Sequence, residues 1–235
     1  MSDLSLTGVD VAGEVGDGAD LAGLLLDALE TSGLSLADGD VVVVTSKVVA
    51  KSEGRVVALA DTPAAKDALV EAESTRVLRR RGDLRITETP HGFVNANAGV
   101  DLSNTAAGTA VLLPVDPDRS ARRLRAQLRR RAHVDVAVVV TDTFGRAWRQ
   151  GVTDVAIGSA GLRALVDLRG TPDANGRVLE ATEVAIADEI AGAADLVMGK
   201  ARGAPFAILR GLDPAFRGDG AAADLVRPAG EDLFR

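Results

Sequence analysis

The sequence contains no cysteine, no tyrosine and only two histidines. The absence of cysteine excludes disulfide bonds, thiolate zinc sites and a cysteine nucleophile. Two histidines argue against a histidine cluster for a transition metal, which directs attention to oxygen ligands. Aromatic residues make up only 3% of the chain, so the hydrophobic core must consist mainly of Val, Leu, Ile and Ala.

Charge and hydropathy argue against two further classes of protein. The formal net charge is −7, whereas domains that bind nucleic acid usually carry a basic excess. The basic cluster at residues 119–131 has Leu124 and Leu128 at helical spacing, which favours the solvated face of an amphipathic helix over a nucleic-acid patch. No apolar stretch is long enough to span a bilayer, and the first residues lack the layout of a signal peptide. We therefore expect a cytoplasmic protein that binds neither nucleic acid nor membrane.

The chain mixes expected helices and strands without a repeating β–α period. Hydrophobic spacing and glycine or proline boundaries predict helices at residues 21–32, 62–81, 119–131 and 182–194. Strands are expected at residues 40–46 with a continuation over 47–51, and at 84–88, 110–113, 134–141 and 204–210, with 160–168 either a strand or a short helix. No linker divides the chain, so we expect one domain, residues 1–235. This order favours a mixed α/β or α+β fold, with mixed β-sheets and flanking helices, over a doubly wound one.

Two of the expected strands run from an apolar segment directly into oxygen-bearing side chains. Residues 40–46 end in Thr45 and Ser46, and the strand expected to end at Thr141 is followed by Asp142. Active sites of α/β proteins commonly form where loops leave the strands. Two such strand ends could face one cleft, although a buried strand followed by a solvated turn is the alternative interpretation.

The common nucleotide-binding and metal-binding motifs are absent. Lys200 follows a glycine but lacks the spacing of a P-loop, and Ala201 stands where that motif needs a hydroxyl. Gly218 and Gly220 resemble a dinucleotide-binding loop, but no expected strand precedes them. Of the histidines, His133 directly precedes an expected strand and is interpreted as structural, so His91 is the better functional candidate.

The remaining candidates suggest oxygen-based metal chemistry and phosphate binding. Carboxylates and hydroxyls are the ligands that Mg²⁺ and Mn²⁺ prefer, and lysine or arginine side chains can then neutralise phosphate oxygens. The loop at residues 91–104 is rich in Asn and Gly, which also favour turns for backbone reasons alone, so a purely structural loop stays an open alternative. The candidates are Asp101, Asp142 and Thr143 for the metal, and Lys51, Arg146 and Arg149 for phosphate.

Five sequence blocks between about residues 40 and 200 together point to one protein family. They cover residues 42–55, 96–104, 141–151, 182–189 and 195–200. In these blocks, and in their order, the sequence resembles the coenzyme F420-0:L-glutamate ligase family. The combination is highly specific, whereas a single block would not be.

The resemblance implies a GTP-dependent ligase that forms an amide bond. In that family GTP phosphorylates the terminal carboxylate of the phospholactyl deazaflavin F420-0, and the amino group of L-glutamate then displaces phosphate. Further γ-linked glutamates can follow. The resemblance also implies an intertwined homodimer of mixed α/β subunits. Some relatives carry a nitroreductase-like domain after the ligase domain, so this chain is either free-standing or the N-terminal part of a longer bifunctional protein.

The resemblance also assigns roles to individual residues. It implies that Mg²⁺ or Mn²⁺ is bound by Asp101, Asp142 and Thr143, with K⁺ as a further candidate cation. The implied nucleotide contacts are Ser46, Lys51, Asn104 and an N-terminal loop of Gly13, Glu14, Val15 and Gly16. That loop is longer and contains proline in the family, so it is the weakest of the matches. The catalytic candidates are Asp101, Asp142 and Lys51, together with Arg146, which is added from its charge and position and not from the resemblance.

Three residues near the third block are candidates from charge and position alone. Arg146, Trp148 and Arg149 either bind the acidic substrate or pack at the rim of the sheet. Two other functions stay open for the whole chain. One is a non-catalytic module that binds a nucleotide or a deazaflavin, against which the presence of both aspartates and Lys51 argues. The other is an amide ligase that acts on a different carboxylate.

Overall fold

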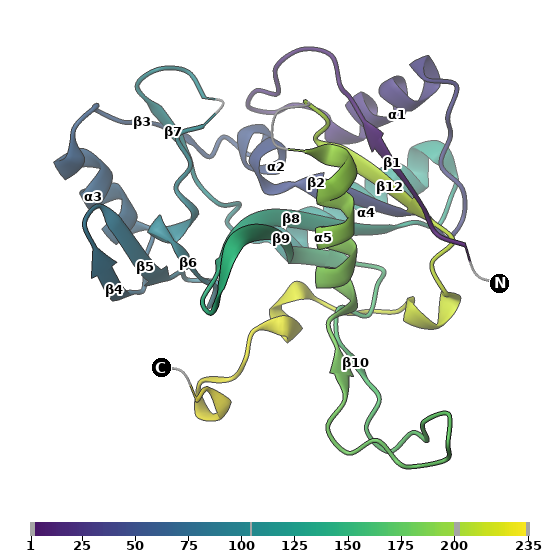
Figure 1. Cartoon of the computed structure of the whole chain (residues 1–235). Helices are drawn as coiled ribbons and strands as arrows, with labels where there is room; N and C mark the ends of the chain where they lie inside the picture. The colour runs from purple at the N-terminus through teal and green to yellow at the C-terminus, as the bar shows by residue number, and fades with distance from the viewer. Residues whose placement is uncertain (1–2, 104, 200–202, 234–235) are drawn as a thin grey trace.

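The computed structural model describes residues 3–103, 105–199 and 203–233, and its centre is a five-stranded mixed sheet (Figure 1). The strand order is β1-β12-β2-β8-β9, and only β2 and β8 pair in parallel. The strands are β1 (Ser5–Val9), β2 (Val41–Thr45), β8 (Ala137–Arg146), β9 (Arg149–Ala160) and β12 (Phe206–Arg210). This mixed sheet with helices on its faces confirms the predicted fold class.

Helices cover both faces of the central sheet. One face carries α1 (Leu21–Thr31), α2 (Ser46–Ser52) and α4 (Pro117–Ala132), and the other carries α5 (Ile186–Met198). Successive side chains of a strand point to opposite faces. In β2, Val42 and Val44 therefore join the core on the α1 and α4 side, whereas Val41 and Val43 join the core against α5. Burial on both faces explains why this strand is continuously apolar rather than alternating.

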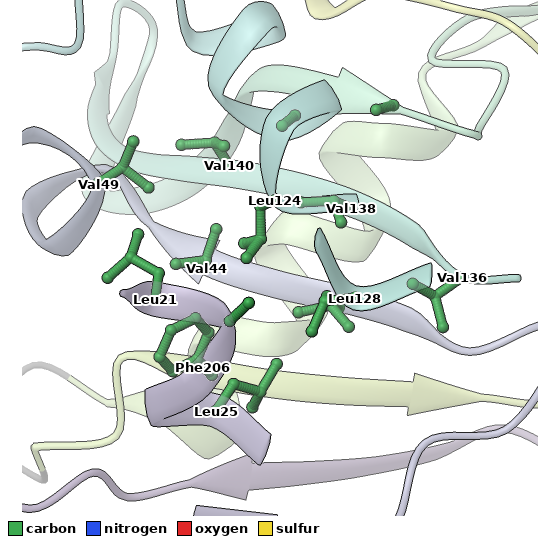
Figure 2. Packing of buried hydrophobic residues seen from close by; sticks show 14 of the residues in the cluster. Leu21, Leu25, Val44, Val49, Leu124, Leu128, Val136, Val138, Val140 and Phe206 are labelled. Carbon is green, nitrogen blue, oxygen red and sulfur yellow. The ribbon is translucent and has the colours of Figure 1, made fainter. Parts of the chain in front are cut away.

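The core between the sheet and helices α1 and α4 is tightly packed (Figure 2). Leu25 of α1, Leu128 of α4 and Phe206 of β12 meet there, and each is 0% exposed. Leu124 and Leu128 both point inward, as the spacing in the basic segment predicted. The arginines of α4 mostly lie on its exposed side, so this segment is an amphipathic helix.

Residues 56–111 form a smaller lobe beside the sheet (Figure 1). Its elements are β3 (Val56–Ala58), α3 (Pro63–Ala72), β4 (Arg76–Arg81), β5 (Leu84–Glu88), β6 (Val94–Ala96), the 3₁₀ turn η1 (Asn97–Gly99) and β7 (Thr109–Val111). Strand β3 pairs with β7, and β4, β5 and β6 form a separate three-stranded sheet. Phe93 of this lobe packs edge-to-face on Phe144 of β8, with ring centroids 6.1 Å apart. The lobe is thereby attached to the long β8–β9 hairpin.

The last third of the chain contains an arm and short turns. Strands β10 (Val166–Asp167) and β11 (Glu183–Val184) pair at the base of a loop that projects from the body (Figure 1). Three 3₁₀ turns follow β12, namely η2 (Pro214–Phe216), η3 (Ala222–Leu225) and η4 (Ala229–Glu231). In the described part of the chain, every helix is too short or too polar to cross a bilayer.

The expectation that residues 47–51 continue a strand is wrong, because they belong to helix α2. Valine-rich sequences favour strands, but tertiary packing overrides this weak preference. The buried residues of α2 are Ser46, Val49 and Ala50, which is helical spacing. The chain therefore turns from β2 into a helix at Ser46.

Two other expected boundaries are also wrong. Helix α3 ends at Ala72, and the arginine run expected at its end forms β4, which pairs with β5 through a turn at Gly82. Gly82 has a positive φ of 56°, which glycine adopts without strain. Strand β8 runs beyond Thr141 to Arg146, so Asp142 and Thr143 lie within a strand that pairs with β9.

Truncation of a core leucine tests the packing of α4 on the sheet. Leu128→Ala should lower the free energy of unfolding by about 3 kcal/mol, because it removes buried methyl groups and leaves a cavity. Leu196→Ala is the matched control, because Leu196 is 80% exposed on α5. Urea unfolding followed by circular dichroism measures both. Equal losses in the two variants would contradict the packing described here.

Candidate active site

The parallel pairing of β2 and β8 places the candidate residues side by side. Thr45 and Thr141 are paired in the register of these strands. The next residue of each, Ser46 at the start of α2 and Asp142 in β8, then meet directly. The Ser46 hydroxyl donates a hydrogen bond to Asp142 Oδ1 at 2.9 Å. The two strand ends that resemble each other in sequence therefore face one site.

A cleft of about 760 Å³ opens at this end of the sheet. Its walls come from the N-terminal loop, the start of α2, the loop after η1, the β8–β9 hairpin and the C-terminal end of α5. The cleft brings together most of the residues singled out from the sequence. Those that line it are Gly13, Glu14, Val15, Ser46, Lys51, Asp101, Asp142 and Thr143.

The carboxyl group of Asp142 lies in an environment that disfavours its charge. Burial raises the pKa of Asp142 to about 6, and the nearby charges of Asp154 and Asp101 act in the same direction. Hydrogen bonds from the Ser46 hydroxyl and the Thr143 N–H oppose this shift without cancelling it. The site therefore carries more negative charge than its own hydrogen bonds offset.

Asp101 approaches the cleft from the smaller lobe and is held by specific contacts. Its Oδ2 lies 2.7 Å from Lys47 Nζ, and its Oδ1 accepts a hydrogen bond from the Ser103 N–H at 2.7 Å. Burial alone would raise the pKa of Asp101, but the hydrogen bonds from Lys47 and Ser103 outweigh it and hold the pKa below its usual value. Asp101 is therefore charged at neutral pH.

A third carboxylate, Asp154 of β9, supports the wall of the cleft. It is 4% exposed and accepts hydrogen bonds from Thr143 Oγ1 at 2.6 Å and Thr141 Oγ1 at 3.1 Å. Thr143 and Asp154 are cross-strand partners in the β8–β9 hairpin. Because Thr143 donates its proton to Asp154, its oxygen lone pairs stay available to a cation.

The donor set fits a hard divalent cation. Among the described residues, no group of three or more His, Asp or Glu side chains is arranged to hold a metal ion. Asp101 and Asp142 nevertheless act on each other electrostatically in one cleft. Mg²⁺ commonly takes one or two protein carboxylates and completes its shell with water and phosphate oxygens. A bound cation would also offset the excess negative charge around Asp142.

The N-terminal loop forms part of the wall of the cleft. Gly13, Glu14 and Val15 line it, whereas Gly16 does not. The Gly18 N–H donates to the Ser52 carbonyl at 3.0 Å, which fastens this loop to the end of α2. Asn104, a predicted nucleotide contact, lies outside the described residues.

The predicted residues at the hairpin tip lie away from the cleft lining. Arg146 Nη2 donates to the Gln150 carbonyl at 2.6 Å, which closes the turn between β8 and β9. Arg146, Trp148 and Arg149 are all exposed, and Trp148 is 83% exposed. A catalytic role for Arg146 stays a prediction, and its observed contact is with its own hairpin.

Neither histidine lines the cleft: His133 ends a helix, and His91 contacts a backbone carbonyl oxygen. His133 caps the C-terminus of α4 in the left-handed conformation, with φ of 56°, which agrees with its structural interpretation. His91 Nε2 lies 3.0 Å from the Pro114 carbonyl oxygen, and its ring stacks on Phe93 with centroids 5.3 Å apart. His91 is not among the residues that line the cleft.

Sequence reasoning missed three charged residues that line the cleft. They are Lys47, Asp154 and Asp195. Lys47 lies in the same block as Ser46, but the strand expected over residues 47–51 gives its side chain no role. Asp154 reaches the cleft because β9 pairs with β8 beyond Thr141. The strand expected from the sequence ends at Thr141, so this pairing could not be predicted. Asp195 lies in the fifth block, but the sequence does not indicate which side of helix α5 faces the cleft.

Replacement of Asp142 by asparagine tests the electrostatics of the cleft. The folded-state pKa of about 6 is above the unfolded value, so the favourable contribution of the protonated carboxyl is lost as the pH rises through 6. At pH 7.5 the metal-free wild type should carry a penalty of up to about 3 kcal/mol, which Asp142→Asn removes. The variant should therefore unfold at higher urea concentration at pH 7.5, and the gain should shrink towards pH 4.5.

Asp27→Asn is the matched control for this experiment. Asp27 is exposed on α1, so its replacement changes the net charge equally without relieving a buried carboxylate. The control should show little change at either pH. A metal-free Asp142→Asn protein that is no more stable than wild type at pH 7.5 would refute this description of the cleft.

Comparison with known proteins identifies the family. A sequence profile described as F420-0:Gamma-glutamyl ligase matches residues 11–211. Coenzyme F420:L-glutamate ligase of Methanothermobacter thermautotrophicus is 43% identical over 249 residues, which covers 99% of each chain. The protein of the same name from Methanopyrus kandleri is 42% identical, and the match covers 99% of this chain and 98% of that protein. The one from Methanocaldococcus jannaschii is 39% identical, and the match covers 85% of this chain and 86% of that protein. The chain therefore belongs to the F420-0:gamma-glutamyl ligase family and is a ligase.

Proposed function

We propose that this enzyme joins L-glutamate to coenzyme F420-0, with GTP as the source of energy and a divalent cation in the cleft. The observation that carries the proposal is the meeting of Ser46, Lys51, Asp101 and Asp142 in one cleft of a chain that belongs to this family. The names of relatives at 39–43% identity support the substrates. The nucleotide and the metal rest on the sequence resemblance and on the chemistry of the cleft.

The proposed reaction has two steps. The carboxylate of F420-0 attacks the γ-phosphorus of GTP, which forms an acyl phosphate and releases GDP. The amino group of L-glutamate then attacks the acyl carbon, the amide bond forms, and inorganic phosphate leaves as the nitrogen loses a proton. Phosphorylation is needed because an ionised carboxylate has no adequate leaving group. The sum is one glutamate added for each GTP converted to GDP and phosphate.

The residues of the cleft suit this chemistry. Asp101 and Asp142 would hold Mg²⁺ or Mn²⁺, which neutralises phosphate charge and orients the phosphate oxygens when bound. Lys51 and Lys47 of α2 both line the cleft, where their positive charges can offset the remaining phosphate charge. Ser46 keeps the Asp142 carboxylate oriented through its hydrogen bond. The chain itself needs to supply no covalent nucleophile for a transfer through an acyl phosphate.

We also propose a homodimer, on the basis of the family resemblance. Two features of the structure are compatible with it. Leu84 and Val94 are 42% and 38% exposed in the β4–β5–β6 sheet, and Val178 is 55% exposed on the projecting arm. Singly exposed apolar residues are common on protein surfaces, so the proposal of a dimer rests on the resemblance.

A product assay tests the proposed reaction. Incubation with F420-0, GTP, L-glutamate and Mn²⁺ should yield the glutamylated product and an equal amount of GDP, measured by mass spectrometry and chromatography. Asp101→Asn should lower turnover by at least about a hundredfold, because it removes a charged ligand from the phosphate-transfer site. The exposed Asp27→Asn variant serves as the control.

The outcome also separates the alternatives. GTP consumption with no glutamate-bearing product would indicate a ligase for another carboxylate or amino acid. Binding of GTP or F420-0 without turnover under any of these conditions would indicate a non-catalytic module. Full activity of Asp101→Asn would remove Asp101 from the proposed site.

A further inference from the structure

The ammonium group of Lys47 is enclosed by oxygen atoms at the edge of the cleft. Its Nζ lies 2.7 Å from Asp101 Oδ2, 2.8 Å from the Ser103 carbonyl oxygen and 2.9 Å from Ser103 Oγ. A lysine ammonium has three N–H donors, and these three acceptors match them. All three come from residues 101–103, so Lys47 connects helix α2 to the loop that carries a proposed metal ligand.

Both carboxylate oxygens of Asp101 are already engaged in this arrangement. Oδ2 contacts Lys47, and Oδ1 accepts the Ser103 N–H at 2.7 Å. Lys47 therefore supplies positive charge to a cleft that also contains Asp142 and Asp154. A second cation on Asp101 would compete for the same oxygen and would be repelled by the ammonium group.

We propose that Lys47 is an internal counter-ion, which neutralises Asp101 in the metal-free enzyme and releases it when a divalent cation binds. This inference rests on the proposed metal site. Lys47 suits the role because an ammonium group on a long flexible stem can leave a carboxylate by rotation of side-chain bonds alone. The Lys47 and Asp101 side chains are 22% and 41% exposed, so water can replace the ammonium as it leaves.

A purely structural role for Lys47 makes the opposite prediction. If its contacts served only to hold residues 101–103 in place, removing them would loosen the proposed ligand Asp101 and weaken metal binding. If Lys47 competes with the metal, removing its charge should strengthen metal binding. The sign of the change in metal affinity therefore distinguishes the two roles.

The test is a titration of the full chain with Mn²⁺ in the absence of nucleotide. Free Mn²⁺ is measured by electron paramagnetic resonance, so no activity is needed. Lys47→Met should bind Mn²⁺ about three- to tenfold more tightly than wild type, because the competing charge is gone. Lys47→Arg, which keeps the charge, should remain close to wild type.

Lys66→Met is the matched control for net charge. Lys66 lies on α3 and is not among the residues that line the cleft, and its replacement removes the same single positive charge. Its Mn²⁺ affinity should equal that of wild type. Thermal melting of each metal-free variant checks folding, and Lys47→Gln replaces Lys47→Met if the latter does not fold.

Each outcome has a defined meaning. Tighter Mn²⁺ binding by Lys47→Met, with no change in Lys66→Met, supports the counter-ion role. If Lys47→Met binds Mn²⁺ no more tightly than wild type, while Asp101→Asn binds it more weakly, the counter-ion role is overturned and the metal site is supported. Absence of Mn²⁺ binding to wild type, or binding that Asp101→Asn does not weaken, overturns both the metal site and the counter-ion role.

Discussion

The parallel pairing of β2 with β8 is the constraint on which the site depends. The two strands pair through Thr45 and Thr141, and then they diverge, because β2 turns into α2 while β8 continues to Arg146. This difference exposes the edge of β8 and lets Ser46 donate to Asp142. The valine runs of β2 and β8 bury both faces of the sheet, and the register that pairs Thr45 with Thr141 brings the residues that follow them together. The same two strands therefore form the core of the sheet and position the residues of the site.

The cleft contains a carboxylate whose charged form is disfavoured in the folded protein, which lowers the stability of the metal-free protein at neutral pH. Burial of its carboxyl group raises the pKa of Asp142, and the charges of Asp154 and Asp101 act in the same direction. The costs are limited locally by the hydroxyls of Ser46, Thr141 and Thr143 and by Lys47. These contacts do not remove the electrostatic strain, which a bound cation would relieve. Perturbed carboxylates in a cleft are typical of functional sites.

Much of the fold could be predicted from the sequence, and so could eight of the residues that line the cleft, because those predictions rest on local patterns. The apolar runs before Thr45 and Thr141 predict two strands, which the structure pairs, and Leu124 and Leu128 predict the buried face of α4. What failed depended on tertiary contacts. The valines of α2 look like a strand by composition, and only their burial at helical spacing reveals a helix. Asp154 reaches Thr143 through the β8–β9 register, and Lys47 reaches Asp101 across two lobes, so neither contact has a local signature.

We propose that Asp101 and Asp142 together form the cation site of this ligase. Crystals of the protein grown with Mn²⁺ and GDP would test it most directly through the anomalous scattering of the metal. An anomalous peak is expected within coordination distance of a carboxylate oxygen of both Asp101 and Asp142. A well-ordered metal at another place in the cleft, with neither Asp101 nor Asp142 among its ligands, would contradict it.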